Sequence, residues 1–256
     1  MAPDRIVLIT EYNGARYHGF QWQANLPTIQ EEMEKAISQL TGKKSRVMAA
    51  SRTDSGVHAR GQVASFKTDS PLPCRTFVTG LNHYLPGDIA VKAAYRMADD
   101  YNVRRQATSR EYRYTIWNSF SRSPLNEDYS YRVSGNLNTE AMNQACQALI
   151  GKHDFASFAT CLEPGTKSTT RHVYRASVQR HEETVTFDIE ANAFLPHQVR
   201  NTVGALIEVG LRRMSSEEFY GIMEARKTGL AGPTVPACGL CLMKVNYASP
   251  LKEATS

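Results

Sequence analysis

The apolar residues of the first hundred positions follow two kinds of spacing, one typical of strands and the other typical of amphipathic helices. Within residues 5–12, Ile6 and Leu8 alternate with Val7 and Ile9, which predicts a strand. Apolar residues at helical spacing over 29–40 predict an amphipathic helix that ends at Gly42. Thr28 and Glu31 form the pattern of a capping box at the beginning of this helix. Further elements complete a β-α-β-β-α-β order: two strands flanking residues 51–59, a helix over 73–84 and a strand over 89–96.

The second half of the chain repeats this order with one further helix. Alternation predicts strands over 110–118, 171–180 and 184–191, and a strand that contains Cys241. Helical spacing predicts helices from Leu137 to Gly151, from Pro196 onward and over 217–227, with Pro196 in the first turn of its helix.

Two units of this kind predict an α+β fold. Their edges can join into one mainly antiparallel sheet with a central cleft between the halves, and we expect substrate in that cleft. We predict an N-terminal half over 1–105, a C-terminal half over 106–247 and a tail over 248–256.

The run from Ser51 to Ala59 places one acidic side chain, Asp54, in a polar loop that contains Gly56. Apolar residues 47–50 precede it, and 62–66 follow with the alternation of a half-buried strand. Asp54 is therefore predicted on a strand-to-strand connection, where a rigid scaffold presents chemistry to solvent. The alternative is an ordinary turn, in which the aspartate bonds its own backbone.

Composition and charge narrow the function classes. With 256 residues, 41% of them hydrophobic, the chain can bury one large core or two modest ones. The net charge of +5 suggests an anionic partner, although a plain solvated surface is the alternative. Tyrosines interleave with basic residues, a pattern typical of surfaces that meet phosphates and stack bases. The basic residues fall into three clusters: Arg104, Arg105, Arg110 and Arg113; Lys167, Arg171, His172 and Arg175; and His197, Arg200, Arg212 and Arg213.

Cysteine and histidine positions do not indicate a metal or redox centre. Five cysteines at irregular spacing are no disulfide framework, so we expect a reducing compartment. Cys238 and Cys241 lie in or beside a predicted strand, and no second pair exists for zinc, so we interpret both as structural. His58 and His153 are also interpreted as structural. No apolar stretch approaches the ~20 residues that span a bilayer, so we expect a cytoplasmic protein with no membrane partner.

Seven motifs, in order and covering nearly the whole chain, resemble the tRNA pseudouridine synthase A family. They are Tyr12-Asn13-Gly14 with Gly19-Phe20-Gln21, Arg52-Thr53-Asp54, Asn82 with Leu85 to Ile89, Arg110 with Tyr112 to Tyr114, His153-Asp154-Phe155 with Ser157-Phe158, Ala191 to Leu195 with His197 and Val199-Arg200-Asn201, and Pro236-Ala237 with Gly239-Leu240.

The resemblance implies an isomerase that converts uridine to pseudouridine in the anticodon stem-loop of tRNA, at tRNA positions 38, 39 and 40. Asp54 matches the essential aspartate, which either attacks C1′ or removes a proton from C2′. The two routes stay open. The reaction consumes no outside atom or electron, so we expect no cofactor and no metal. The resemblance also implies a homodimer with tRNA as its partner.

The resemblance assigns four further residues to the site. Arg200 matches the arginine that pairs with the aspartate, and its alternative is a surface cation. Tyr112 matches the tyrosine that stacks on the uracil and assists removal of the C5 proton, and its alternative is core packing. Arg52 matches an arginine that fills the space of the everted nucleotide, or it contacts phosphate. Leu240 matches an apolar residue that lines the uracil site.

Two other functions remain open at this point. One is a non-catalytic RNA-binding or tRNA-folding module on the same scaffold, against which the presence of Asp54, Tyr112 and Arg200 argues. The other is a hydrolase with Asp54 as nucleophile, which lacks a recognisable second acid or metal cluster.

Overall fold

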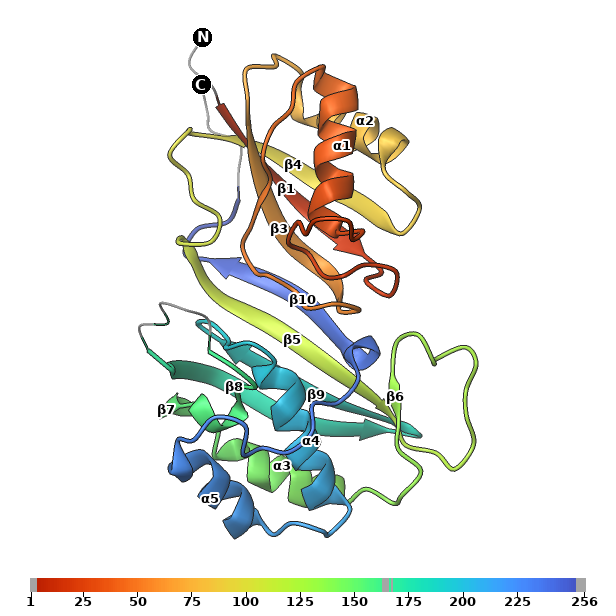
Figure 1. Ribbon diagram of the computed structural model, residues 1–256, viewed down its shortest axis with the longest axis vertical. Coiled ribbons are helices and arrows are strands. Elements are labelled where there is room, and N and C mark those ends of the chain that lie inside the picture. The colour runs from red at the N-terminus through yellow and green to blue at the C-terminus, as the bar shows by residue number, and fades with distance from the viewer. Residues whose placement is uncertain (1–3, 163–165, 167, 252–256) are drawn as a thin grey trace. The chain divides into compact units, whose positions relative to one another are not determined.

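The computed structural model describes residues 4–162, 166 and 168–251. Lys167 of the predicted basic clusters and the last five residues of the predicted tail lie outside this part. The described chain forms two units, one over 4–110 and 242–251 and the other over 111–241 (Figure 1). The residues of each unit lie close together in space, which does not test where one domain ends and the next begins. The predicted domain boundaries therefore stay a prediction.

The first unit has the predicted β-α-β-β-α-β order. Its elements are β1 (Asp4–Tyr12), α1 (Ile29–Thr41), β2 (Met48–Ala49), β3 (His58–Thr68), α2 (Cys74–Tyr84) and β4 (Ile89–Met97). Strand β1 lies between β4 and β3 and pairs antiparallel with both, and the short β2 pairs antiparallel with β3. The predicted elements of this half are confirmed.

Helix α1 begins and ends at the predicted residues. The Thr28 hydroxyl accepts a hydrogen bond of 3.3 Å from the Glu31 backbone N–H. The Glu31 carboxylate forms an ion pair with Lys35 at 3.0 Å. Gly42 ends the helix with φ at 71°, a left-handed conformation that glycine adopts at little cost.

Helices α1 and α2 pack against each other over the sheet. At Gly80 of α2 an added Cβ would lie 2.6 Å from a Leu40 methyl of α1, so the absence of a side chain sets how closely the helices approach. Beneath them, Phe66 of β3 and Phe77 of α2 are fully buried with ring centroids 5.7 Å apart, edge to face. Truncating such a ring to alanine costs about 3–5 kcal/mol, so these contacts are a main source of the unit's stability.

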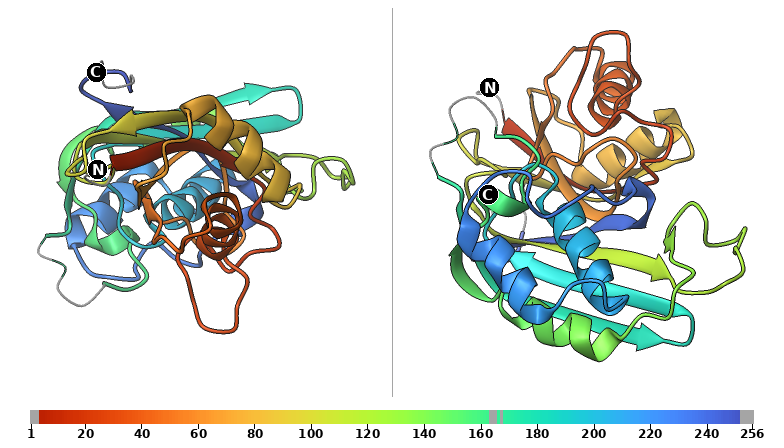
Figure 2. Two further views of the ribbon diagram at one scale, coloured as in Figure 1. Left: turned by 90° about the horizontal axis from the view of Figure 1, so that it is seen from above. Right: turned by 60° about the horizontal axis from the view of Figure 1, so that its bottom comes forward.

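In the described part of the second unit, a mainly antiparallel sheet carries the helices over 139–147, 198–210 and 216–225 on one face (Figure 2). Its main strands follow the order β5-β9-β8-β7, and β6 pairs with β5 in parallel. From Ala107 onward the chain forms β5 (Ala107–Trp117), β6 (Tyr131–Arg132), α3 (Thr139–Gln147), β7 (Gly151–Asp154), the 3₁₀ turn η1 (Ala156–Phe158), β8 (Thr170–His181), β9 (Thr184–Ala191), α4 (Gln198–Gly210), α5 (Ser216–Ala225), the 3₁₀ turn η2 (Ala237–Gly239) and β10 (Leu240–Tyr247). Strands β5 and β10 have residues in both units.

The predicted end of α3 was wrong. The helix stops at Gln147, and Leu149 and Ile150 form tight turns through N–H bonds to Cys146 and Gln147. Gly151, at φ 111°, then begins β7, a strand that the predicted order of elements lacks. Leu149 is fully buried in a turn after the helix. Its apolar side chain therefore continues the helical spacing although its backbone is not helical, and this is why the predicted helix is too long.

The predicted beginning of α4 was also wrong, because Pro196 precedes the helix. The N-cap is His197 at φ 60°, and the first helical residue is Gln198. The buried Gln198 amide oxygen accepts a 2.8 Å bond from the Leu195 N–H, which supports this tight entry. The predicted α+β class with mainly antiparallel strands is confirmed, and the central cleft stays a prediction.

Candidate active site

Asp54 lies on the loop between β2 and β3, as predicted. Within the loop, burial alternates: Arg52 is exposed, Thr53 is 6% exposed and Asp54 is half-buried. Thr53 therefore anchors the segment inside the unit, and its two neighbours carry the charges at the surface. A backbone bond of 3.2 Å from Val57 N–H to the Asp54 carbonyl closes the turn.

A buried polar network fixes Thr53 from below. Its hydroxyl shares a 2.8 Å hydrogen bond with the Tyr12 hydroxyl, which also accepts one of 3.3 Å from the Gln62 amide. The same Gln62 amide donates to the Ser51 carbonyl at 2.7 Å, and its oxygen accepts from the Ser51 N–H. Since Gln62 and Tyr12 are buried, breaking any of these bonds would leave a polar group unsatisfied, at about 1–3 kcal/mol.

Two glycines outside the loop lie directly against its backbone. A Cβ added at Gly19 would lie 2.7 Å from the Thr53 carbonyl oxygen and 3.2 Å from the Asp54 carbonyl carbon. A Cβ at Gly14 would collide with the Val57 carbonyl group. The 13–20 segment also bonds the loop through the Phe20 N–H to the Thr53 carbonyl, at 3.0 Å. The loop is thus held on this side by backbone contact that admits no side chain.

Tyr17 joins the loop to the turn before β4. Its carbonyl accepts bonds from the Gly56 N–H at 3.2 Å and from the Ser55 hydroxyl at 3.3 Å. Its phenol donates to the Asp88 carboxylate at 2.6 Å. Burial, followed by this bond to Asp88, raises the pKa of Tyr17, so the phenol keeps its proton and the link persists at neutral pH.

In the second unit, Tyr112 occupies a buried position on β5. Its ring meets Phe194 edge to face, with centroids 5.2 Å apart and planes at 88°. Phe194 belongs to the segment that leads into α4, so this contact couples β5 to the beginning of that helix.

Arg200 lies in the first turn of α4 and is half-buried. Its Nε donates a 2.8 Å bond to the Val235 carbonyl, which orients the guanidinium. The 233–239 segment that accepts this bond is itself seated tightly: the Tyr114 phenol donates to the Pro236 carbonyl at 2.8 Å, and a Cβ at Gly239 would lie 2.7 Å from the Tyr114 ring. Leu240 follows directly and is 5% exposed.

Arg52 and Asp54 thus belong to the first unit, and Tyr112, Arg200 and Leu240 belong to the second. Within the second unit, the segments that carry its three residues are linked by the contacts above. The meeting of all five at one site stays a prediction.

The first predicted basic cluster does not form one surface. Arg110 is only 8% exposed, and its guanidinium donates to the carbonyls of Ala50, Arg104 and Ala107. It therefore braces the start of the Asp54 loop, and its prediction as a surface cation was wrong. Arg113 forms a bidentate pair with Asp188 at 2.8 and 3.1 Å, which offsets its charge.

The cysteines and histidines of interest have structural partners. His58 Nδ1 accepts a 3.1 Å bond from the Gly14 N–H, and a His153 ring nitrogen contacts the Ile150 carbonyl at 2.9 Å. Burial raises the pKa of the Cys238 thiol, which donates to the Ser130 carbonyl. In the part of the chain that the structure describes, no three His, Cys, Asp or Glu side chains gather closely enough to hold a metal ion. Nor does any helix of that part have the length and apolar character to cross a membrane.

The architecture and the buttressed aspartate loop fit the pseudouridine synthase class. The profile of the family described as tRNA pseudouridine synthase matches residues 8–104 and 145–248. Three relatives described as tRNA pseudouridine synthase A each align over 242 residues, 94% of this chain and 99% of their own. Identity is 43% for the protein of Geobacter sulfurreducens, 41% for that of Acetivibrio thermocellus and 40% for that of a Thermoanaerobacter species.

The chain belongs to the tRNA pseudouridine synthase family, whose members are isomerases that convert uridine to pseudouridine in tRNA. Among solved structures, a chain from a Cbf5-Nop10-Gar1 complex aligns with a TM-score of 0.32 and 12% identity, over 80% of this chain and 54% of that one. A similarity this low adds nothing to the assignment.

Sequence reasoning missed the supports of Asp54. No local pattern indicates the roles of Gln62, Tyr17 and Asp88, because each bonds a segment that is not adjacent in sequence. The one signal available was the pair Gly14 and Gly19 in a short polar stretch, since glycine at such positions often marks a close backbone approach.

We predict that Gly19→Ala displaces the Asp54 loop. Gly19 has φ at 92°, a conformation that costs an L-residue about 1–2 kcal/mol, and the added methyl meets backbone that has no room to yield. A shift of the carboxylate of about 1 Å lowers the rate on the order of 10²-fold. Tritium release from tRNA labelled at uridine C5 measures the rate, and chemical denaturation measures stability.

Gly221→Ala is the matched control. Gly221 lies within α5, and a Cβ there meets nothing within 4 Å, so the variant should keep full activity with equal or greater stability. Full activity of Gly19→Ala would contradict the role assigned to this contact.

Proposed function

We propose that this chain isomerises uridine to pseudouridine in the anticodon stem-loop of tRNA, at tRNA positions 38, 39 and 40. The observation that carries the proposal is Asp54 itself: a half-buried carboxylate on a loop held by a buried polar network and two glycines. Membership of the family supplies the reaction, and the motif resemblance supplies the tRNA positions.

The chemistry explains why a rigidly held carboxylate is needed. The N1–C1′ bond breaks, the uracil rotates, a C5–C1′ bond forms, and the proton on C5 leaves while N1 becomes protonated. Ionised Asp54 either attacks C1′ or removes the C2′ proton, and both routes need its oxygen at one fixed distance from the ribose. A loop restrained from three sides holds an oxygen in this way, because moving it would break buried hydrogen bonds.

Four further residues receive roles from the family resemblance. By this resemblance Arg200 takes the place of the arginine that pairs with the aspartate, and its Nε bond to the Val235 carbonyl supports a fixed guanidinium. Tyr112 stacks on the uracil and assists loss of the C5 proton, and Leu240 lines the uracil site. Arg52, exposed beside Asp54, fills the space that the everted nucleotide leaves or contacts phosphate.

We predict that Asp54→Asn abolishes the reaction while tRNA binding persists. The amide keeps the shape of the side chain but removes the negative oxygen, and losing a group of this kind costs at least ~10²-fold in rate. The assay is tritium release from tRNA labelled at uridine C5. Asp69→Asn, which changes an exposed aspartate paired with Lys43, is the matched control and should be fully active.

The same assay separates the alternatives. Tritium release by the parent that Asp54→Asn loses supports the isomerase. No release from any uridine of the anticodon stem-loop would favour a non-catalytic RNA-binding or tRNA-folding module. Free uracil or a broken strand would indicate a hydrolase.

Recognition should depend on tRNA shape and phosphates, because an enzyme that serves neighbouring positions cannot read one fixed sequence. We therefore predict that tRNA affinity falls by at least about tenfold between roughly 50 and 200 mM salt, since each neutralised phosphate releases counterions. Filter binding measures the dissociation constant. A flat affinity over this range would contradict recognition through phosphates.

We further propose that the enzyme is a homodimer and acts in the cytoplasm. The dimer comes from the family resemblance. A mass measurement in solution at micromolar concentration should give twice the chain mass of 28.6 kDa. A mass of one chain at the concentration used for activity would refute the dimer.

A further inference from the structure

A pocket of about 650 Å³ lies on the first unit, beside α1. This volume falls in the usual range of small-molecule sites, about 300–1,000 Å³. We call it the Trp22 pocket. It is lined by Trp22, by Glu31, Glu34, Lys35, Ser38 and Gln39 of α1, and by Lys44, Ser45 and Arg46. No residue assigned to the reaction lines it.

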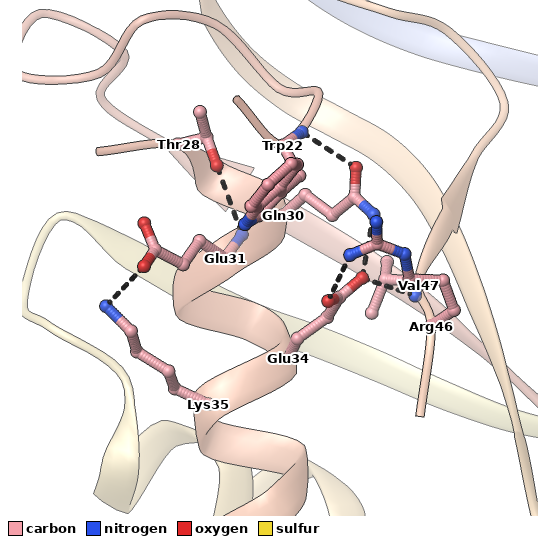
Figure 3. A network of polar contacts seen from close by, with 8 residues as sticks. All are labelled: Trp22, Thr28, Gln30, Glu31, Glu34, Lys35, Arg46 and Val47. Atoms are coloured by element: carbon pink, nitrogen blue, oxygen red, sulfur yellow. Dashed lines mark hydrogen bonds and ion pairs between the residues drawn. The ribbon is translucent and has the colours of Figure 1, made fainter. Parts of the chain in front are cut away.

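The Trp22 indole lines this pocket, and the Arg46 guanidinium lies over the indole ring. Trp22 is 43% exposed, and the guanidinium carbon of Arg46 lies 5.4 Å from the indole centroid (Figure 3). The backbone N–H of Trp22 donates a 2.9 Å bond to the Gln30 amide oxygen, which holds the Trp22 backbone against α1. The exposed part of the ring offers an aromatic surface on which a planar ligand can stack.

The acidic side chains of the pocket are already engaged. Glu34 accepts bonds from the Gln30 amide at 2.7 Å, from the Val47 N–H at 2.9 Å and from Arg46 at 3.0 Å (Figure 3). Glu31 pairs with Lys35. Glu34 thus holds Arg46 in place over the indole. The Glu34 carboxylate already accepts hydrogen bonds from three donors of this chain.

The donors that remain face outward. Lys44 is exposed and makes no ion pair with any described residue, and Gln39 makes no side-chain hydrogen bond there. Hydrogen bonds to Glu32 and Glu31 raise the pKa of Lys35, so it stays protonated. Lys35 and Arg46 are already paired with carboxylates, so among the described residues Lys44 and the Gln39 amide are the donors left for a ligand. An unpaired ammonium beside an amide matches an anion with acceptor oxygens.

The pocket is mechanically tied to the Asp54 loop. Phe20, two residues before Trp22, donates its N–H to the Thr53 carbonyl, and Gly19 lies against Thr53 and Asp54. Gln30 in turn donates its N–H to the Phe20 carbonyl at 2.9 Å. The indole and the aspartate loop therefore belong to one hydrogen-bonded piece of the first unit.

We infer that the Trp22 pocket binds an unstacked nucleotide of the substrate tRNA outside the reacting uridine. The base stacks on the exposed indole, and Arg46 and Lys44 meet its phosphate. An aromatic platform beside cations is the arrangement by which proteins hold single-stranded nucleotides. The inference rests on the proposed function, because it takes tRNA as the substrate, and it adds a binding subsite lined by none of the residues assigned to the reaction.

Intrinsic fluorescence tests the inference directly. The chain has two tryptophans, so Trp117→Phe leaves Trp22 as the only one. Titration of this variant with unmodified tRNA should quench and shift the Trp22 emission with the same midpoint as tRNA binding followed by filter retention. Unchanged emission at saturating tRNA would overturn the subsite.

Kinetics provide the second readout. Trp22→Ala should raise KM for tRNA about tenfold or more and leave kcat within about twofold, since one stacked base is lost. Trp22→Phe keeps a ring and should restore most of the affinity, even where the alanine variant is unstable. An unchanged KM, or a fall in kcat alone, would refute the subsite.

Charge reversal provides a matched pair. Lys44→Glu should weaken tRNA binding more than Lys227→Glu, which makes the same change at an exposed lysine of the second unit. Equal effects would show only a dependence on net charge and would overturn a local subsite. A missing subsite can be told apart from a wrong proposed function. If the proposed function is wrong, the parent protein releases no tritium from the labelled tRNA.

Discussion

The structure of the candidate site depends on one close approach, that of the 13–20 segment to the backbone of the Asp54 loop. Gly14 and Gly19 admit no side chain at this contact. Backbone packed on backbone leaves neither side free to shift, so the carboxylate inherits the rigidity of the strands on both sides of the loop. The buried bonds among Tyr12, Thr53 and Gln62 extend this restraint into the core. The position of the Asp54 loop therefore depends on buried residues behind it.

The second unit uses the same physical device around Arg200. Gly204 and Gly239 let the 233–239 segment lie close to α4 and β5, where a Cβ at Gly204 would come 2.8 Å from the Pro233 carbonyl oxygen. The segment then offers its Val235 carbonyl to the Arg200 guanidinium. A charged side chain whose hydrogen bond ends on fixed backbone loses little further freedom when it binds a partner. Each unit thus holds its charged group through close contacts between its own segments.

Much of the fold was predictable from local pattern. The Thr28 cap, the Gly42 stop and the alternation of β1 gave the order of the first unit, because these signals act within a few residues. The errors at α3 and α4 have a common cause. Leu149 is buried in a turn, and His197 begins its helix in a left-handed conformation, and in both cases tertiary packing outweighed the local preference. The assignment of Arg110 to the surface failed for a related reason, since a guanidinium can be buried when carbonyls from distant segments satisfy it.

The sequence alone determined the class of the protein and the identity of its candidate residues, because motif order and residue chemistry are properties of the chain itself. It placed Asp54 between two strands, since the apolar residues before the loop and the alternation after it are local signals. Only the tertiary structure decided what holds that residue: the Gln62 amide, the Tyr17 carbonyl and the two glycines come from segments separated in sequence. It also decided that Trp22 and Arg46 share one pocket. Contacts of this kind follow from how helices and strands pack, and no short stretch of sequence contains that information.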